Sequence, residues 1–191
     1  TGEGIGKTGA FTWFVKDSVV GDRISAFVMK SKKNYGYARL NKVLRASKDR
    51  IEPKCSVARA CGGCSLQNMS YERQLELKDN MIINNLIRIG KFSKDFFVND
   101  SDAYDIPGVC IHYPIIGMEE PWRYRNKSIY PVAVKKDATV YGFYAARTHS
   151  VIEPDDCLIG IEENKPIMEA VMRFIKKYGI AVYDESEHRG L

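Results

Sequence analysis

Three cysteines within ten residues constrain this chain more than any other feature of its sequence. Cys55, Cys61 and Cys64 follow the pattern C-x5-C-x2-C, and Gly62 and Gly63 fill the second gap. Thiolates two residues apart on a tight turn can face one metal centre, and glycines let the backbone pass close to a bulky ligand. Because such a centre commonly has four ligands, the spacing predicts a fourth ligand from elsewhere in the chain.

The two remaining cysteines differ as candidates for that fourth ligand. Cys157 follows the turn-like segment EPDD, whereas Cys110 lies in a predicted strand, where a free cysteine is often simply buried. Cys157 is therefore the better candidate. Four interpretations stay open at this point: a zinc site, an iron–sulfur cluster, a redox pair of Cys61 and Cys64, and core cysteines without metal.

The N-terminal third of the chain has the pattern of a small β-structure. Apolar or alternating segments at residues 11–15, 22–29 and 35–40 are separated by turns rich in glycine, aspartate and lysine. Short strands of this spacing predict an OB-like β-barrel over residues 1–47. The remainder, residues 48–191, mixes helical and strand patterns, so the predicted fold class is α+β.

Two helices are predicted from apolar periodicity. The first begins after Ser70, a suitable N-cap, and ends at Gly90; the second begins near Asn164 and ends at Gly179. Apolar residues at helical spacing give the first helix one apolar face, formed by Tyr71, Leu75, Ile82, Leu86 and Ile89. In the second helix they predict a buried face, formed by Ile167, Val171, Phe174, Ile175 and Tyr178.

Weaker patterns complete the predicted elements. Residues 109–115 have strand character, and residues 180–183 could begin another strand. The β-rich segments 127–134 and 139–146 flank a turn and predict a hairpin. Asp155 and Asp156, beside Cys157, could form a paired-carboxylate site but are more simply turn formers.

Charge is unevenly distributed along the chain. The net charge is +5, but residues 1–54 hold 12 Lys and Arg against 5 Asp and Glu, whereas the rest holds 17 against 19. A basic block predicts either a surface that meets a polyanion or a basic face that is only solvated. No stretch approaches the roughly 18 apolar residues of a membrane span, and the start lacks the apolar core of a signal peptide. We therefore expect a cytoplasmic monomer without a membrane partner.

Two clusters of cations with aromatic or amide side chains could contact RNA. Lysines contact phosphates, and exposed tyrosines stack on unpaired bases. The alternatives are that Tyr35 and Tyr37 belong to the barrel core and that the second cluster makes ordinary salt bridges. The candidate RNA contacts are Lys30, Lys32, Lys33, Asn34, Tyr35, Tyr37, Arg39, Arg123, Arg125, Asn126 and Lys127.

Three segments together resemble a known family. Residues 55–78, CSVARACGGCSLQNMSYERQLELK, resemble the cluster-binding segment of the bacterial RNA uracil-5-methyltransferases that modify 23S ribosomal RNA. Residues 2–22 look like the TRAM domain of that family, and residues 121–132, PWRYRNKSIYPV, resemble its YRNK strand. Asn68 departs from the family's usual histidine, at a position that is not a cluster ligand.

The resemblance implies a [4Fe-4S] cluster held by Cys55, Cys61, Cys64 and Cys157. It also implies methylation of uridine C5 with S-adenosylmethionine, in 23S ribosomal RNA or, as the alternative, in transfer RNA. In the family a further Rossmann-like domain binds the methyl donor and carries the nucleophilic cysteine. These 191 residues show no such motif, so we expect no catalytic residue here and no activity of this chain alone. The rivals are a stand-alone RNA-binding module with a structural four-cysteine metal site, and a redox protein.

Overall fold

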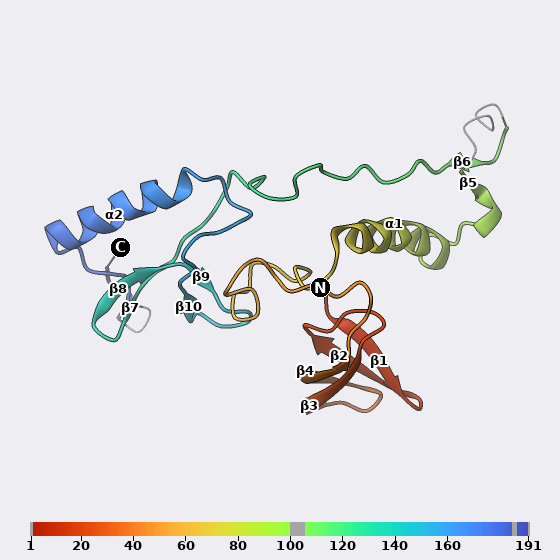
Figure 1. Ribbon diagram of the computed structural model, residues 1–191, viewed down its shortest axis with the longest axis horizontal. Helices are drawn as coiled ribbons and strands as arrows, with labels where there is room; N and C mark the ends of the chain where they lie inside the picture. Colours follow the sequence, from red (N-terminus) through yellow and green to blue (C-terminus); the bar gives the residue numbers. More distant parts are fainter. Residues whose placement is uncertain (1, 100–105, 185–186, 191) are drawn as a thin grey trace. The chain divides into compact units, whose positions relative to one another are not determined.

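The computed structural model describes residues 2–99, 106–184 and 187–190, and the chain divides into two units (Figure 1). Unit 1 comprises Thr1–Met69 and Glu120–Leu191, and unit 2 comprises Ser70–Glu119. Sheets and helices occupy separate segments, which confirms the α+β class. Across the described residues, no helix combines the length and apolar character that crossing a membrane requires.

The N-terminal part of unit 1 is a four-stranded mixed sheet. Its strands are β1 (Gly4–Thr8), β2 (Phe11–Lys16), β3 (Arg23–Ser31) and β4 (Tyr35–Arg45), in the order β1-β2-β4-β3. β2 and β4 are parallel, and the other two pairs are antiparallel. Strands β2, β3 and β4 confirm the strands predicted at residues 11–15, 22–29 and 35–40. The sequence did not predict β1, because its residues GIGKT carry little strand propensity.

Aromatic packing explains why this sheet forms where it does. Phe14 of β2 lies beside Tyr35 and Tyr37 of β4, with ring centroids 6.0 and 5.6 Å away. Between the tyrosines, Gly36 leaves room for the Trp13 ring, because a Cβ there would overlap a ring carbon. Register shifts in the β3–β4 pair mark irregularities of the kind that bend a sheet.

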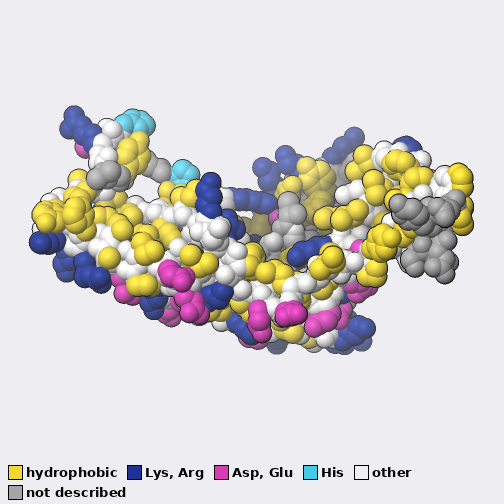
Figure 2. All heavy atoms as spheres, turned by 90° about the horizontal axis from the view of Figure 1, so that it is seen from above, with side chains coloured by type: hydrophobic (Ala, Val, Ile, Leu, Met, Phe, Trp, Pro, Cys, Tyr) yellow, Lys and Arg dark blue, Asp and Glu magenta, His cyan; other side chains and the backbone are white. Residues whose placement is uncertain are grey.

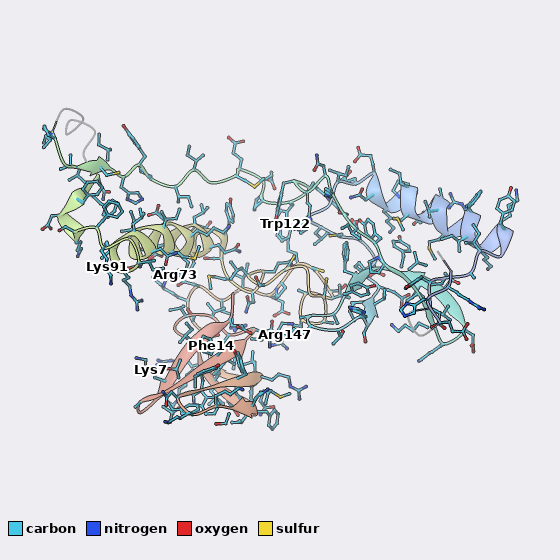
Figure 3. The ribbon with its side chains drawn as sticks, turned by 180° about the vertical axis from the view of Figure 1, so that it is seen from behind. Lys7, Phe14, Arg73, Lys91, Trp122 and Arg147 are labelled. Atoms are coloured by element: carbon cyan, nitrogen blue, oxygen red, sulfur yellow. The ribbon has the colours of Figure 1, made fainter. Side chains whose placement is uncertain are left out.

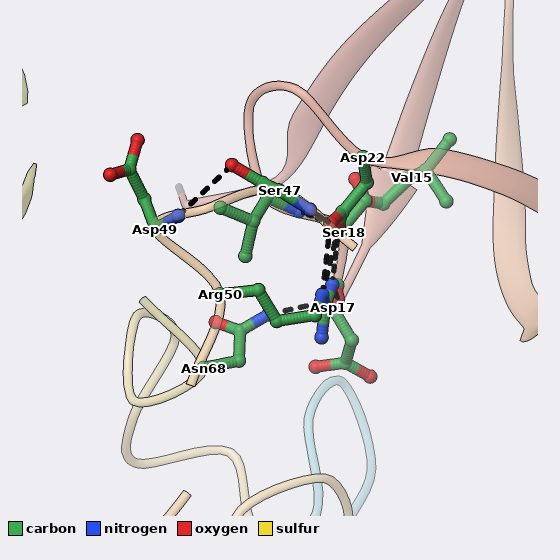
Figure 4. Close-up of polar contacts among 9 residues, drawn as sticks. Val15, Asp17, Ser18, Asp22, Ser47, Asp49, Arg50 and Asn68 are labelled. Atoms are coloured by element: carbon green, nitrogen blue, oxygen red, sulfur yellow. Dashed lines mark hydrogen bonds and ion pairs between the residues drawn. The ribbon is translucent and has the colours of Figure 1, made fainter. Parts of the chain in front are cut away.

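A buried ion pair joins the sheet to the segment that carries the cysteines (Figure 4). The Asp22 side chain is only 1% exposed and accepts hydrogen bonds from Arg50 Nε at 3.0 Å and Nη2 at 2.6 Å. Arg50 Nη2 also donates to the Asp17 carbonyl at 2.7 Å, and so does Asn68 Nδ2 at 2.8 Å. These bonds fix both ends of the cysteine segment against the sheet.

The C-terminal part of unit 1 contains short strands and one helix. β7 (Val132–Lys135) pairs with β8 (Ala138–Tyr141), which confirms the predicted hairpin around the same turn. The pairing is shorter than predicted: residues 127–131 form no strand, and β9 (Phe143–Tyr144) pairs with β10 (Val151–Ile152) instead. Residues 180–183 form no strand either.

The last helix, α2 (Asn164–Tyr178), lies beside β8 (Figure 1). It ends at Gly179, whose φ of 59° lies in the left-handed region and so favours glycine. Both the helix and its glycine cap confirm the prediction.

Unit 2 is built on α1 (Tyr71–Arg88). Its N-cap is Ser70, whose hydroxyl accepts a hydrogen bond from the Arg73 amide, as predicted. After the short 3-10 turn η1 (Lys94–Phe96), β5 (Phe97–Val98) pairs with β6 (Cys110–Ile111). The strand predicted over residues 109–115 is therefore only two residues long.

The prediction that α2 buries its apolar face is wrong within this structure. Neither helix has a buried residue in the part of the chain described. Hydrophobic side chains gather at the surface where α2 lies, at the left of Figure 2. Periodicity determines which residues share a face, but not what covers that face. The four-residue strands β7 and β8 span about 13 Å and α2 about 22 Å, so this hairpin is too short to cover the helix. The exposed members are Ile82, Leu86, Ile89, Ile167, Val171, Phe174 and Tyr178.

Candidate four-cysteine and RNA-binding site

The first three cysteines lie on one compact loop of unit 1. A helical turn separates Cys55 from Cys61, because the amides of Ala58 and Cys61 donate to the carbonyls of Cys55 (3.1 Å) and Val57 (2.8 Å). Gln67 Oε1 accepts a hydrogen bond from the Cys55 amide at 3.4 Å. The loop therefore holds its own shape by backbone bonds.

Gly62 fixes this loop against strand β9. Its amide donates to the Tyr144 carbonyl at 2.9 Å, and Cys61 forms an isolated antiparallel bridge with Ala145. A Cβ on Gly62 would lie 2.8 Å from the Tyr144 carbonyl oxygen and 3.0 Å from the Ala146 nitrogen. Only glycine permits this approach without a shift of the backbone.

Cys157 is brought to the same place by a second loop. The backbone amides of Arg123 and Arg125 donate to the carbonyls of Leu158 (3.0 Å) and Ile159 (2.8 Å). Segment 123–125 and segment 157–161 therefore run side by side. The Gly160 amide also donates to the Cys157 carbonyl at 2.9 Å, which closes a tight turn after the cysteine.

The four cysteines line one cavity of about 810 Å³. All five cysteines of the chain are free thiols, and Cys110 is exposed in unit 2, whereas the other four belong to unit 1. The structure therefore brings together the four residues predicted as ligands and leaves out the fifth. In the described residues, no three His, Cys, Asp or Glu side chains converge closely enough to hold a single metal ion.

Burial and mutual repulsion act on these thiols. Burial raises the pKa of Cys61 and of Cys64, and the neighbouring cysteines, including Cys157, raise each further. Opposing this rise, the Gly63 amide donates to Cys61 Sγ at 3.3 Å, and the Lys16 ammonium lowers the Cys61 pKa. Without a bound cation these shifts favour the neutral thiols of Cys61 and Cys64, so thiolates at these two positions require added positive charge.

The donor set fits a thiolate-ligated iron–sulfur cluster in residue identity and in a shared cavity. A cluster is wider than one ion, so its ligands need not converge on one point. If such a cluster binds, Cys55, Cys61, Cys64 and Cys157 would supply its thiolates, and it would join the cysteine loop to segment 157–161.

Most of the predicted RNA contacts are exposed on unit 1. Lys30, Lys32, Lys33 and Asn34 surround the exposed β3–β4 turn, and Arg39 is exposed further along β4. Arg125, Asn126 and Lys127 are also exposed and line the cysteine cavity. The two predicted clusters thus lie on different segments, and the second belongs to the wall of the four-cysteine site.

Tyr35, Tyr37 and Arg123 are less available than the sequence suggests. Tyr35 is exposed at the edge of the aromatic cluster, but Tyr37 is half-buried. The Arg147 guanidinium lies 5.7 Å from the Tyr37 ring centroid, near Phe14 of the same aromatic cluster (Figure 3). Arg123 is half-buried, and its guanidinium points to the Cys157 loop rather than to solvent.

Sequence reasoning missed Lys16 and Arg147 as parts of this site, and it noted Gln67 only as a motif residue of segment 55–78. Lys16 Nζ donates to the Arg59 carbonyl at 3.0 Å, and Arg147 pairs with Glu3 at 2.9 Å. Together with Tyr37 and Arg39, Lys16 and Arg147 line a groove of about 500 Å³ beside Cys61. Neither Lys16 nor Arg147 lies in a cluster of cations in the sequence, so no local charge pattern identified them.

Comparison with known proteins gives relatives of one kind. No family model matches the chain. Proteins named as uncharacterized RNA methyltransferases match over 189 residues, with 40% identity in Halalkalibacterium halodurans, 39% in Clostridium acetobutylicum and 37% in Listeria monocytogenes. Each match covers 99% of this chain but 38% of the relative. The chain is thus similar to a little over a third of each of these RNA methyltransferases.

One solved structure shares the fold of the whole chain. It is the Pyrococcus abyssi tRNA (uracil-54, C5)-methyltransferase in complex with S-adenosyl-L-homocysteine. The TM-score is 0.58 at 22% identity, and the match covers 100% of this chain and 38% of that one. At this identity the likeness concerns the fold.

Proposed function

We propose that this chain is the RNA-binding and cluster-binding part of an S-adenosylmethionine-dependent RNA uracil-C5 methyltransferase. The observation that carries the proposal is the cavity shared by Cys55, Cys61, Cys64 and Cys157, in a chain whose relatives are named RNA methyltransferases over nearly its whole length. The four-stranded sheet acts as an OB-like TRAM domain, and the rest of unit 1 carries a [4Fe-4S] cluster.

The charge distribution supports RNA as the partner. The exposed lysines of the β3–β4 turn supply phosphate contacts, and Tyr35 supplies a ring at the edge of the same surface. Arg125, Asn126 and Lys127 supply a second set of RNA contacts at the wall of the cysteine cavity. The cluster acts by holding that wall in shape, and the methyl transfer belongs to residues outside this chain.

The first choice of substrate is 23S ribosomal RNA, from the resemblance of residues 55–78 to the enzymes that modify it. Transfer RNA is the second candidate, because the structural neighbour is a tRNA methyltransferase.

Binding of the anaerobically purified chain to 23S ribosomal RNA segments and to tRNA, measured side by side at several salt concentrations, tests the proposal. Tighter binding to a ribosomal segment supports the first substrate, and tighter binding to tRNA supports the second. If the chain binds both RNAs and an unrelated DNA with equal affinity, an RNA-recognising role is contradicted.

A further inference from the structure

Arg123 makes contacts that the RNA surface does not explain. Its Nη1 donates to the carbonyls of Cys157 at 3.1 Å and Gly160 at 3.2 Å, and its Nη2 donates to Asp156 Oδ2 at 2.5 Å. Its Nε lies 3.6 Å from a Glu162 carboxylate oxygen. One guanidinium therefore contacts four residues of the loop that carries Cys157.

The backbone of Arg123 has an unfavourable positive φ while its side chain makes these contacts. Its φ is +55°, in the left-handed region, which strains the backbone of a residue with a Cβ. The amide of the same residue donates to the Leu158 carbonyl at 3.0 Å. The side chain of Arg123 thus contacts Asp156, the residue before Cys157, and its main chain contacts Leu158, the residue after it.

The Arg123 contacts also compensate the charges of the Cys157 loop. The loop carries Asp156 next to the cysteine and Glu162 five residues on. The Arg123 guanidinium lies 2.5 Å from the Asp156 carboxylate and 3.6 Å from that of Glu162. Without Arg123, the loop would lose these ion pairs together with the hydrogen bonds to the Cys157 and Gly160 carbonyls, so it would hold Cys157 less firmly.

We propose that Arg123 is a positioning residue, which presents Cys157 to the cavity shared with Cys55, Cys61 and Cys64. The inference rests on the proposed four-cysteine site. It assigns to Arg123 a role other than the RNA contact predicted from sequence. Asp156 is its partner in this role, because the carboxylate fixes the guanidinium plane over the loop.

The test measures alkylation of each cysteine in the metal-free chain by mass spectrometry. In Arg123→Ala we expect Cys157 to react at least about tenfold faster relative to Cys110, because the released loop exposes its thiol and the loss of charge-assisted hydrogen bonds permits a change of this size. Cys110 is an internal reference, because it is exposed in unit 2. Lys135→Ala is the matched control, since it removes the exposed 3.0 Å pair with Glu153, four residues before Cys157, and leaves the Arg123 contacts in place. It should leave the ratio unchanged.

Three further variants separate side chain from backbone. Arg123→Gly relieves the left-handed strain, so it should unfold at a higher temperature than Arg123→Ala. Cys157 should be as reactive in Arg123→Gly as in Arg123→Ala, because both variants lack the guanidinium. Arg123→Lys and Asp156→Asn should be intermediate, because each keeps part of the contact set. They also provide a readout if the alanine variant does not fold.

Iron retention gives a second readout in the reconstituted chain. Release of iron to a chelator should be several-fold faster in Arg123→Ala than in Lys135→Ala. An unchanged Cys157-to-Cys110 ratio in the folded Arg123 variants would overturn the positioning role, and weaker RNA binding with that ratio unchanged would return Arg123 to the RNA surface. Failure of the wild-type chain to take up iron would overturn the proposed cluster site instead, while the alkylation ratio would still test the contact.

Discussion

At the scale of single residues, the Asp22–Arg50 pair connects stability to pH. Burial raises the Asp22 pKa, but the bonds from Arg50 and from the amides of Ser47 and Val19 outweigh it, so the pKa lies below its ordinary value of 3.8. The folded state therefore releases this proton more readily than the unfolded state. The stability that the pair contributes is fully present above about pH 4 and is lost as pH falls through the lowered pKa.

Replacing Asp22 by asparagine should remove that contribution. We expect a loss of about 3 kcal/mol at pH 7, because Arg50 keeps its charge without its partner. Urea unfolding at pH 7 and pH 3 measures this loss. The difference in free energy of unfolding between the variant and wild type should be smaller at pH 3 than at pH 7. The exposed Asp137→Asn serves as the control, and a wild-type-like free energy of unfolding for Asp22→Asn at pH 7 would refute the prediction.

Gly62 and Gly63 form a matched pair for testing the cysteine loop. A Cβ at Gly62 would meet backbone atoms at 2.8 and 3.0 Å, whereas one at Gly63 would meet only Cys61 Sγ at 3.5 Å. Gly62→Ala should therefore destabilise the metal-free chain by about 1–3 kcal/mol, the usual range for overpacking. Gly63→Ala should cost less, as measured by thermal unfolding. Equal destabilisation by Gly62→Ala and Gly63→Ala would show that the contact between Gly62 and β9 does not require glycine.

Residue identities in the site could be predicted from sequence, but their partners could not. The cysteine spacing and the turn before Cys157 predicted the four residues that share the cavity. Asp156 looked like a turn former and Arg123 like an RNA contact, yet they pair with each other across 33 positions of sequence. Asn68 stands where the family has histidine, and its side chain still supplies an N–H donor, to the Asp17 carbonyl. Long-range pairing of this kind leaves no local pattern.

At the scale of elements, the β3–β4 turn should supply the salt-sensitive part of RNA binding. Reversing the charge of Lys30, Lys32 and Lys33 to glutamate should reduce the slope of log affinity against log salt by about 2–3, because each phosphate that a lysine neutralises adds roughly 0.7–0.9 to that slope. Fluorescence anisotropy with a ribosomal RNA segment measures the slope.

A matched control for this turn lies on α2. Lys165, Lys176 and Lys177 are also exposed, so reversing all three changes the net charge by the same amount. This control should leave most of the slope intact. Equal effects of the two triple variants would mean that net charge, not the β3–β4 turn, sets the affinity.

Element prediction succeeded where periodicity was strong and local. β2, β4, α1 and α2 are found where the pattern placed them, and the Ser70 cap and the Gly179 end are confirmed. β1 and β5 were missed because a glycine-rich run and a two-residue strand have no measurable period. The exposed face of α2 was predicted as buried, because periodicity shows that a helix is amphipathic but not what covers its apolar face.

At the scale of the whole molecule, the four cysteines would link two distant parts of unit 1. Residues 55–64 and Cys157 are nearly a hundred positions apart, and a shared metal centre would act as a cross-link between them. Among the described residues of unit 1, the buried hydrophobic side chains are few, namely Val15, Val19, Ala38, Met69 and Val151. A metal cross-link would therefore contribute a large share of the stability of unit 1.

Cys61→Ser should therefore abolish metal binding and lower the melting temperature of the metal-loaded chain by several degrees. Cys110→Ser is the matched control, because it removes a thiol outside the cavity. Metal analysis and differential scanning calorimetry measure the two effects. Unchanged metal content and melting temperature in Cys61→Ser would contradict a ligand role for this residue.

The most direct measurement is the iron, sulfide and zinc content of the chain purified without oxygen, together with its visible absorption spectrum. The four-cysteine cavity and the resemblance of residues 55–78 predict about four iron and four sulfide per chain, with the absorption of a [4Fe-4S] cluster. Stoichiometric zinc without sulfide would contradict the cluster assignment, and it would favour an RNA-binding module with a structural zinc site.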